Sequence, residues 1–482
     1  MTLPDKQTLE REIKLGVARG FLLPSFDGDP LPENTFTSTY YDTDTYRLAQ
    51  AGITLRCRVE GAKGLWQLKL PRDMARLELE YTGDRAEPPE PLLKLLFAHL
   101  RRQPIQPIAR LKTRRTGIRV GRPGNPTADV VMDSVAVLDG GRVVRRLHEV
   151  EVELLGGNET ALRRIEKTLR EAGAQDGDAR PKVFQALGLG QPAPLEPLPP
   201  SAPVIEHLKV LLRTQLLEIM RHDPGTRLGS EAEELHKMRV ATRRLRAHLR
   251  AARGILVPAW VDSLRAEAAW LGSLLGPVRD LDVLLGHLEK ETATLRAPER
   301  RAFEALLDRI RQQRLAARTT LLQALESDRY LFLLDRLEAG VQSAAAGDDA
   351  ASLESIACAA FKKLRRAVKA CGLHARDTVL HQIRIKGKRA RYAAELAETV
   401  VGKPAGRFLR RAKEFQDLLG EHHDAVVTEQ RLRKLLSQAH GRLAAFSLGR
   451  LIERQSERRR RVRVQLPKAW RRLKKQGQKA WN

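Results

Sequence analysis

Charged side chains alternate with apolar ones in several short segments of the first 190 residues. Glu10, Glu12 and Lys14 lie two residues apart, so they share one face of an extended strand. The same alternation recurs in Arg56 with Arg58, Gln67 with Lys69, Glu78 with Glu80, Arg110 with Lys112 and Arg114, Asp129 with Asp133, and Glu149 with Glu151 and Glu153. Carboxylates bind hard cations such as Mg²⁺, and Arg and Lys hold multiply charged anions. The combination favours metal-assisted hydrolysis of a phosphoryl compound.

These charged faces need a fold that brings them together. An ordinary antiparallel sheet with one solvated face also shows alternation, but solvated faces usually mix Thr and Ser with both signs of charge. Here carboxylates cluster on some segments and cationic groups on others. We therefore expect a closed antiparallel β-barrel whose charged faces point inward and line a tunnel.

The ordered set of motifs in this region resembles the CYTH, or triphosphate tunnel metalloenzyme, domain. The resemblance covers about residues 8–190 and rests on the Glu-x-Glu-x-Lys segment and on five later matches, which are 39–43, 54–58, 66–71, 149–154 and Lys182. It implies an eight-stranded barrel tunnel that cleaves triphosphate compounds, commonly inorganic triphosphate, with Mg²⁺ or Mn²⁺. Some members instead cyclise ATP or hydrolyse thiamine triphosphate.

The resemblance also implies roles for individual residues. Lys14 would help to orient the attacking water, beside Glu10 and Glu12 as catalytic carboxylates. Metal ligands would be Glu10 and Glu12 with partners among Glu149, Glu151 and Glu153, whose register stays open. The substrate phosphates would be held by Arg56, Arg58, Lys69, Lys112, Arg114 and Lys182.

A cationic segment occurs twice in the second half of the chain. His236 and His381 each begin a run with the same spacing, 381 − 236 = 145 residues apart, and Gly276 and Gly420 follow them at similar distances. In a helix the offsets 0, +3, +7 and +10 fall on one stripe of about 80°. The two stripes are His236, Arg239, Arg243 and Arg246, and His381, Arg384, Lys388 and Arg391.

A solvated helix face is the simplest explanation of an Arg-rich stripe. A free surface, however, does not require the same His-to-Arg geometry twice in one chain. We therefore expect a shared anion site, in which a phosphate chain lies along both stripes if the two halves face each other.

The paired motifs resemble the CHAD, or conserved histidine α-helical, domain over about residues 204–482. This resemblance implies two pseudo-symmetric four-helix bundles, about 204–340 and 350–482, that bind inorganic polyphosphate in a basic channel. The sequence therefore predicts an α+β multidomain protein: a tunnel domain at 1–190, a Pro-rich linker at 191–203 and an all-α domain at 204–482.

Composition supports a polyanionic partner. The 482 residues carry 86 Lys and Arg against 59 Asp and Glu, a net charge of +27. Residues 1–190 contribute 30 − 26 = +4 of it, so the excess belongs to the helical half. Three scattered cysteines, no apolar run of about 18 residues and no signal peptide lead us to expect a cytoplasmic protein without membrane contact.

Three functions are compatible with these features. The one we favour is a Mg²⁺- or Mn²⁺-dependent triphosphatase that also binds polyphosphate, and through it polyphosphate granules. A second is a non-catalytic polyphosphate-binding or granule-associated protein. A third, nonspecific nucleic-acid binding, is less favoured because aromatic residues make up only 5% of the chain and no base-reading motif is present.

Overall fold

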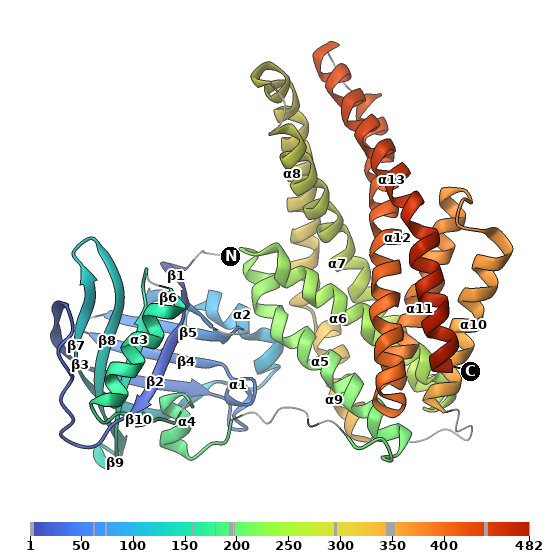
Figure 1. The fold of residues 1–482 in the computed structure, drawn as a ribbon. Helices are drawn as coiled ribbons and strands as arrows, with labels where there is room; N and C mark the ends of the chain where they lie inside the picture. Colours follow the sequence, from blue (N-terminus) through green and yellow to red (C-terminus); the bar gives the residue numbers. More distant parts are fainter. Residues whose placement is uncertain are drawn as a thin grey trace. The chain divides into compact units, whose positions relative to one another are not determined.

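The computed structural model describes residues 4–60, 63–72, 75–156, 158–178, 180–191, 196, 198–293, 296–343, 352–437 and 442–481. The chain divides into two compact units, residues 1–194 and residues 195–482 (Figure 1). Within the Pro-rich segment 191–203 expected as a linker, residues 192–195 and 197 lie outside the described residues.

The first unit is built on one ten-stranded sheet in which all pairings are antiparallel. Its strands are β1 (Lys6–Glu10), β2 (Glu12–Gly16), β3 (Gly28–Asp42), β4 (Thr54–Glu60), β5 (Lys63–Pro71), β6 (Arg76–Gly83), β7 (Gln106–Arg122), β8 (Asn125–Asp139), β9 (Arg142–Leu154) and β10 (Gln175–Asp176). Their order across the sheet is β1-β6-β5-β4-β3-β7-β8-β9-β2-β10.

The predicted closed, eight-stranded barrel is wrong in two respects. The segment expected as one first strand is split at Arg11, so β1 pairs with β6 while β2 pairs with β9. The split and the two-residue β10 raise the number of strands to ten. No pairing among the described strands joins β1 to β2, so the ring of hydrogen bonds is not closed, although these two strands follow each other in the chain on either side of Arg11.

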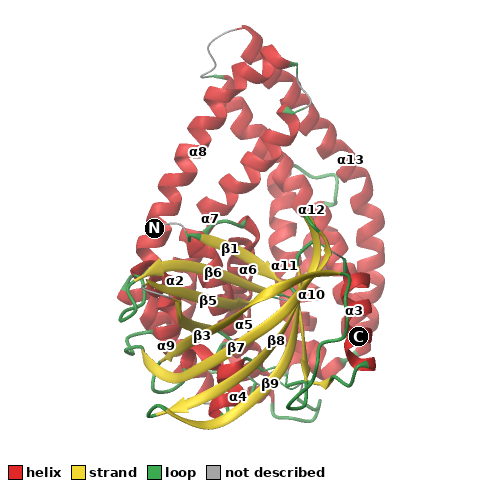
Figure 2. Cartoon of the chain, turned by 90° about the vertical axis from the view of Figure 1, so that its left-hand side faces the viewer, coloured by secondary structure: helices red, strands yellow, loops and turns green. Residues whose placement is uncertain are grey.

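The sheet is nevertheless strongly curved (Figure 2). Its charged face is the concave one, since charged groups on distant strands interact across it. Lys69 on β5 lowers the pKa of Glu151 on β9, although four strands separate β5 from β9 in the sheet. Part of the convex face is apolar. Leu15, Val130 and Val150 pack there against α3 (Glu159–Glu171).

Three further helices complete the first unit: α1 (Arg47–Gln50), α2 (Glu90–Leu100) and α4 (Lys182–Leu187). Helix α4 matters most for the concave face. Val183 and Phe184 are buried in a cluster with Tyr40 and Leu111, which fixes the start of the helix and hence the position of Lys182.

The second unit is entirely helical among its described residues. Its helices are α5 (Val204–Leu228), α6 (Ala232–Ala251), η1 (Ala252–Gly254), α7 (Pro258–Thr292), α8 (Ala297–Leu325), α9 (Asp328–Ser343), α10 (Leu353–Cys371), α11 (Asp377–Val401), α12 (Lys403–Leu436) and α13 (Arg442–Trp481). His236 lies on α6 and His381 on α11, so the repeat equates α5–α8 with α10–α13. Helix α9 is additional to the four helices expected in the first repeat.

The far ends of the two repeats share a core. The long hairpins α7–α8 and α12–α13 bring Leu288 and Phe303 of the first repeat against Leu432 and Leu451 of the second (Figure 1). The two repeats are therefore held together by apolar contact as well as by the helices that carry the stripes.

This shared core predicts a large effect on stability. Phe303 is 1% exposed, so Phe303→Ala should lower the free energy of unfolding of the helical unit by about 3–5 kcal/mol. Phe446 on α13 is 62% exposed, and Phe446→Ala should change it by no more than about 0.5 kcal/mol. Chemical unfolding followed by far-ultraviolet circular dichroism measures both, and equal effects would contradict the shared core.

Candidate active site and anion-binding cavity

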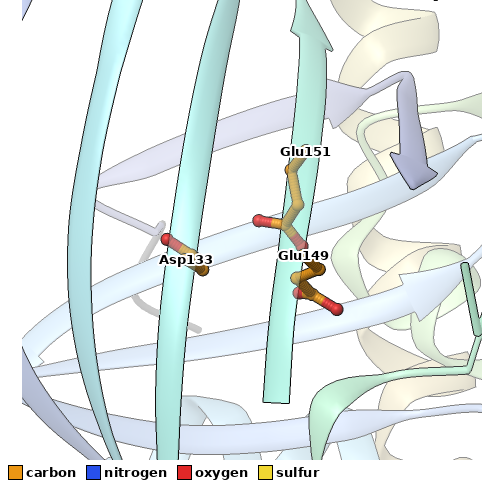
Figure 3. Close-up of side chains that lie close together, drawn as sticks. All are labelled: Asp133, Glu149 and Glu151. Atoms are coloured by element: carbon orange, nitrogen blue, oxygen red, sulfur yellow. The ribbon is translucent and has the colours of Figure 1, made fainter. Parts of the chain in front are cut away.

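Three carboxylates meet on neighbouring strands of the concave face. Asp133 on β8 lies opposite Glu149 on β9, and Glu151 follows two residues later, so all three point to the same side. One oxygen of each lies within 4.8 Å of the others, and all three residues are buried (Figure 3). We call Asp133, Glu149 and Glu151 the first carboxylate group.

Three cations surround this first group. Lys182 Nζ lies 2.5 Å from Asp133, 2.8 Å from Glu149 and 3.2 Å from Glu151. Lys14 Nζ is 2.9 Å from Glu151, and Arg115 Nη2 lies 2.7 Å from Asp133 and 2.9 Å from Glu151. Burial alone would raise the pKa of Glu151, but Lys14, Lys182 and Arg115 hold it well below its usual value. The first group is therefore already neutralised by protein charges.

A second set of carboxylates, Glu10, Glu12, Glu78 and Glu153, has fewer partners. Lys69 Nζ is 2.5 Å from Glu10 and 3.8 Å from Glu78, and Lys14 Nζ is 3.4 Å from Glu12. Burial and a hydrogen bond with Glu10 raise the pKa of Glu78 to about 8. Burial, followed by repulsion from Glu10, raises the pKa of Glu153. We call these four residues the second carboxylate group; its four acids share Lys69 and Lys14, which also pairs with Glu151, and this leaves surplus negative charge.

Surplus negative charge of this kind fits a divalent cation. Carboxylate oxygens are the ligands that Mg²⁺ and Mn²⁺ prefer, and a cation would relieve the repulsion that raises the pKa values of Glu78 and Glu153. The five predicted metal ligands are thus divided. Glu149 and Glu151 join Asp133 in the neutralised group, whereas Glu10, Glu12 and Glu153 lie in the group whose acids outnumber its cations.

Arginines on β4 extend the concave face. Arg56 donates from Nε to Gln67 Oε1 at 2.8 Å and from Nη1 to the Tyr40 hydroxyl at 3.3 Å. The Arg58 guanidinium carbon lies 4.1 Å from the centroid of the Phe36 ring, and that of Arg115 lies 5.8 Å from it. Gln67 and Tyr40 thus orient the Arg56 guanidinium, and the Phe36 ring packs against that of Arg58.

Two predicted phosphate ligands lie elsewhere. Lys112 and Arg114 are on the opposite, exposed face of β7, where Arg114 Nε pairs with Glu33 Oε1 at 2.6 Å. The prediction took the charged alternation of residues 110–114 as the interior face, but on β7 the interior face holds Leu111, Thr113 and then Arg115. Arg115 and Asp133 were therefore missed as a pair. Asp133 was noticed in the sequence, but its strand register with Arg115 could not be read there.

In the helical unit the two stripes do face each other. A cavity of about 400 Å³ is lined by residues of α6, α7, α11 and α12. Its charged or titratable lining residues are His236, Arg239, Arg243, Arg246, Arg279, Asp280, Arg384, Lys388, His423, Asp424 and Arg431. Two predicted residues are not in this lining. Arg391 pairs with Glu395, and His381 Nδ1 lies 3.3 Å from His423 Nδ1.

Uncompensated positive charge characterises this cavity. Asp280 approaches Arg239 only to 3.5 Å, and burial raises the pKa of Asp424. Burial, followed by repulsion from Arg384, Arg243 and Arg239, lowers the pKa of Lys388 to about 7. Burial and the same cationic surroundings lower the pKa of His423 to about 4. The cavity thus concentrates cations that repel one another, as expected of a site prepared for a polyanion.

The comparisons with known proteins agree with the division of the chain into two units. A CYTH domain model matches residues 9–182 and a CHAD domain model matches residues 210–433. An uncharacterized protein of Mycobacterium tuberculosis, found in two strains, is 33% identical over 520 residues, covering 98% of each chain. The chain therefore belongs to the family of proteins in which a CYTH domain, of the triphosphate tunnel metalloenzymes, precedes a CHAD domain.

Solved structures are similar over the helical part. PptA from Streptomyces chartreusis is 24% identical, with a TM-score of 0.47 over 56% of this chain and 100% of its own. The CHAD domain from the plant Ricinus communis is 27% identical, with a TM-score of 0.44 over 57% of this chain and 95% of its own. In the part of the chain that the structure describes, no helix combines the length and apolarity that crossing a membrane requires.

The lowered pKa of Lys388 predicts proton uptake on binding. Well above pH 7 Lys388 is mostly neutral in the free protein, and a bound polyanion raises its pKa, so inorganic polyphosphate should bind there with uptake of up to about one proton. Affinity should then fall as pH rises above about 7. The same shift destabilises the free protein at pH values below about 7, and this penalty disappears toward the ordinary pKa of 10.5.

Calorimetric titrations in buffers of different ionisation enthalpy measure the uptake. Lys388→Arg is the matched control, because an arginine there keeps the charge but does not titrate in this range. Undiminished uptake in that variant would show that Lys388 is not the group concerned.

Proposed function

We propose that the first unit hydrolyses the terminal phosphoanhydride bond of inorganic triphosphate, or of a related triphosphate, with Mg²⁺ or Mn²⁺. The main support is the presence of carboxylates with surplus negative charge and of separately oriented arginines on one concave face. A phosphate-only binding site would have no use for the second carboxylate group, and a metal site alone would have no use for Arg56 and Arg58.

The proposed roles of these residues follow from their charge. Glu10, Glu12 and Glu153 would hold the cation, which when bound supplies charge neutralisation and a more acidic water. Arg56, Arg58 and Lys69 would bind phosphate oxygens and stabilise the charge that develops on them. Lys14, which pairs with Glu12 and Glu151, would orient the water. The oxygen of this water attacks the terminal phosphorus, the bridging P–O bond breaks, and phosphate and pyrophosphate leave.

Arg115 and Arg114 offer a matched test, since they are neighbours on opposite faces of β7. Arg115→Ala should reduce phosphate release from triphosphate by roughly 10²- to 10³-fold, whereas Arg114→Ala should leave it almost unchanged. Arg115→Lys should recover only part of the activity, because lysine keeps the charge but not the two-pronged geometry.

The assay should compare triphosphate, ATP, thiamine triphosphate and long polyphosphate, with Mg²⁺, with Mn²⁺ and with a chelator. Thermal unfolding of each variant separates loss of activity from loss of fold. Absence of metal-dependent release from every substrate would reject the enzyme and leave the non-catalytic alternative.

For the second unit we propose binding of inorganic polyphosphate in the cavity, which would deliver substrate or hold the enzyme at polyphosphate granules. The support is the cavity itself, in which both stripes converge and Lys388 is destabilised by like charge. Among the described residues the lining contains no Phe, Tyr or Trp on which bases could stack, which disfavours nucleic acid.

A double variant tests the cavity. Arg239→Ala with Arg384→Ala removes one stripe residue from each repeat and should weaken polyphosphate binding about a hundredfold or more, since charge-assisted hydrogen bonds contribute about 1.5–3 kcal/mol each. Arg250→Ala with Arg389→Ala removes the same charge from exposed sites on the same helices, outside the cavity lining. Calorimetry measures the affinity of both double variants for polyphosphate. Equal losses of affinity would show that net charge, and not the cavity, determines binding.

A further inference from the structure

The last part of α13 carries positive charge that the cavity does not use. Residues 458–481 contain eleven Lys and Arg and no Asp or Glu. Four of the eleven, Arg458, Arg459, Arg460 and Arg463, form ion pairs with carboxylates. The other seven are exposed and have no ion-pair partner among the described residues: Arg461, Lys468, Arg471, Arg472, Lys474, Lys475 and Lys479.

Five of these residues form a line. At about 100° per residue, Arg461, Lys468, Arg472, Lys475 and Lys479 fall within an arc of about 60° on one side of the helix. At about 1.5 Å per residue, the line extends over about 27 Å. We call these five residues the α13 stripe.

The opposite face of the helix is firmly packed. Leu466 is 0% exposed and Leu473 is 1% exposed. The Trp481 ring lies edge-on to Phe408, with centroids 5.6 Å apart, and a Cβ at Gly477 would lie 2.3 Å from the Phe361 ring. The α13 stripe is therefore presented by a helix that is fixed along its length (Figure 1).

The α13 stripe does not help the helix to form. Like charges at i and i+4, as in Lys468 with Arg472 and Lys475 with Lys479, destabilise a helix by about 0.2–0.5 kcal/mol per pair. The favourable interaction of cations with the helix dipole is confined to the last turn, which contains only Lys479 of the five. The charges are thus unfavourable within the protein and need a partner outside it.

Duplication does not account for the α13 stripe either. Helix α8 is the counterpart of α13, and subtracting the repeat of 145 residues from Arg461, Lys468 and Arg472 gives Ala316, Gln323 and Ser327. On α8, Arg311 is neutralised by Glu289, Glu304 and Asp308. The row of free charge is specific to the second repeat.

We propose that the α13 stripe is a second docking surface for inorganic polyphosphate, used by chains too long for the cavity alone. This inference rests on the polyphosphate binding proposed above. A phosphate chain is recognised by charge only, and between 458 and 481 no aromatic side chain is exposed to stack on a base: Trp470 packs on Phe415, and Trp481 is 4% exposed. A membrane-surface helix needs an apolar face beside its basic one, whereas the exposed large apolar residue here is Val464 alone.

Two attachment points on one protein would make affinity depend on chain length. A chain that occupies both surfaces gains from the high effective concentration of its second segment, and a short chain does not. The α13 stripe thus gives a reason for preferring long polyphosphate that the cavity does not provide.

The test uses the full chain with Lys468→Gln, Arg472→Gln and Lys475→Gln combined. Glutamine keeps helix propensity, and all three positions are exposed, so the unfolding temperature should not fall. The matched control, Lys290→Gln with Arg300→Gln and Arg301→Gln, removes the same charge from exposed positions on α7 and α8. Binding of long polyphosphate and of a short oligophosphate is measured over a range of salt concentrations.

The triple variant should bind long polyphosphate about tenfold more weakly, with a salt slope smaller by about 2, since each neutralised contact contributes roughly 0.7. Binding of the short oligophosphate should not change, and the control should match the wild type for both ligands. Unchanged affinity for the long chain would overturn the proposal.

Two further arms separate the remaining explanations. Loss of binding to single-stranded RNA or to phosphatidylserine vesicles, with long-polyphosphate binding intact, would assign the α13 stripe to another partner and also overturn the proposal. The cavity variant, Arg239→Ala with Arg384→Ala, is measured in parallel. If it leaves short-chain binding unchanged, polyphosphate binding in the cavity fails, independently of the result for the α13 stripe.

Discussion

Charge buried away from water must be balanced by charge nearby, and this constraint organises the concave face of the first unit. Asp133 is completely buried, and an isolated carboxylate there would be strongly unfavourable. Lys182 and Arg115 balance it, and each reaches it from a different part of the chain. Lys182 comes from the first turn of α4 and Arg115 from β7, so strand register and the packing of α4 both have to be correct before the charges can pair.

The first carboxylate group and the cavity of the helical unit differ in how their charges are balanced. In the first carboxylate group every acid has a cation within ion-pair distance, so that group keeps its geometry without a ligand. The cavity of the helical unit leaves Lys388 surrounded by Arg384, Arg243 and Arg239, and the resulting repulsion is visible in its lowered pKa. A balanced arrangement keeps its side chains in fixed positions without a ligand. An unbalanced one, as in the cavity and in the second carboxylate group, suits binding because the ligand supplies the missing charge.

The sequence alone predicts many of the strands and helices and several of the residues in the two candidate sites. The two-residue alternation identified the strands, and the repeated spacing of His236 and His381 identified helices whose stripes the structure brings to one cavity. Prediction from the sequence failed where the interior face of a strand or the register between two strands had to be chosen. Strand β7 has an exposed charged face and, opposite to it, an interior face that includes Arg115. Only the pairing of Arg115 with Asp133 on β8 distinguishes the two faces. The break at Arg11 depends on two different partner strands, β6 and β9, and likewise leaves no local signal.

The cavity has a consequence for the history of the helical unit. Its walls come from both repeats, so a protein with one repeat could build similar walls only by associating with a second copy of itself. Joining both halves in one chain makes that association independent of concentration and frees each half to change separately. Arg279 and His423 show such divergence: each stands three residues after its repeat's glycine, Gly276 or Gly420, and both line the cavity, but one is permanently charged and the other is not.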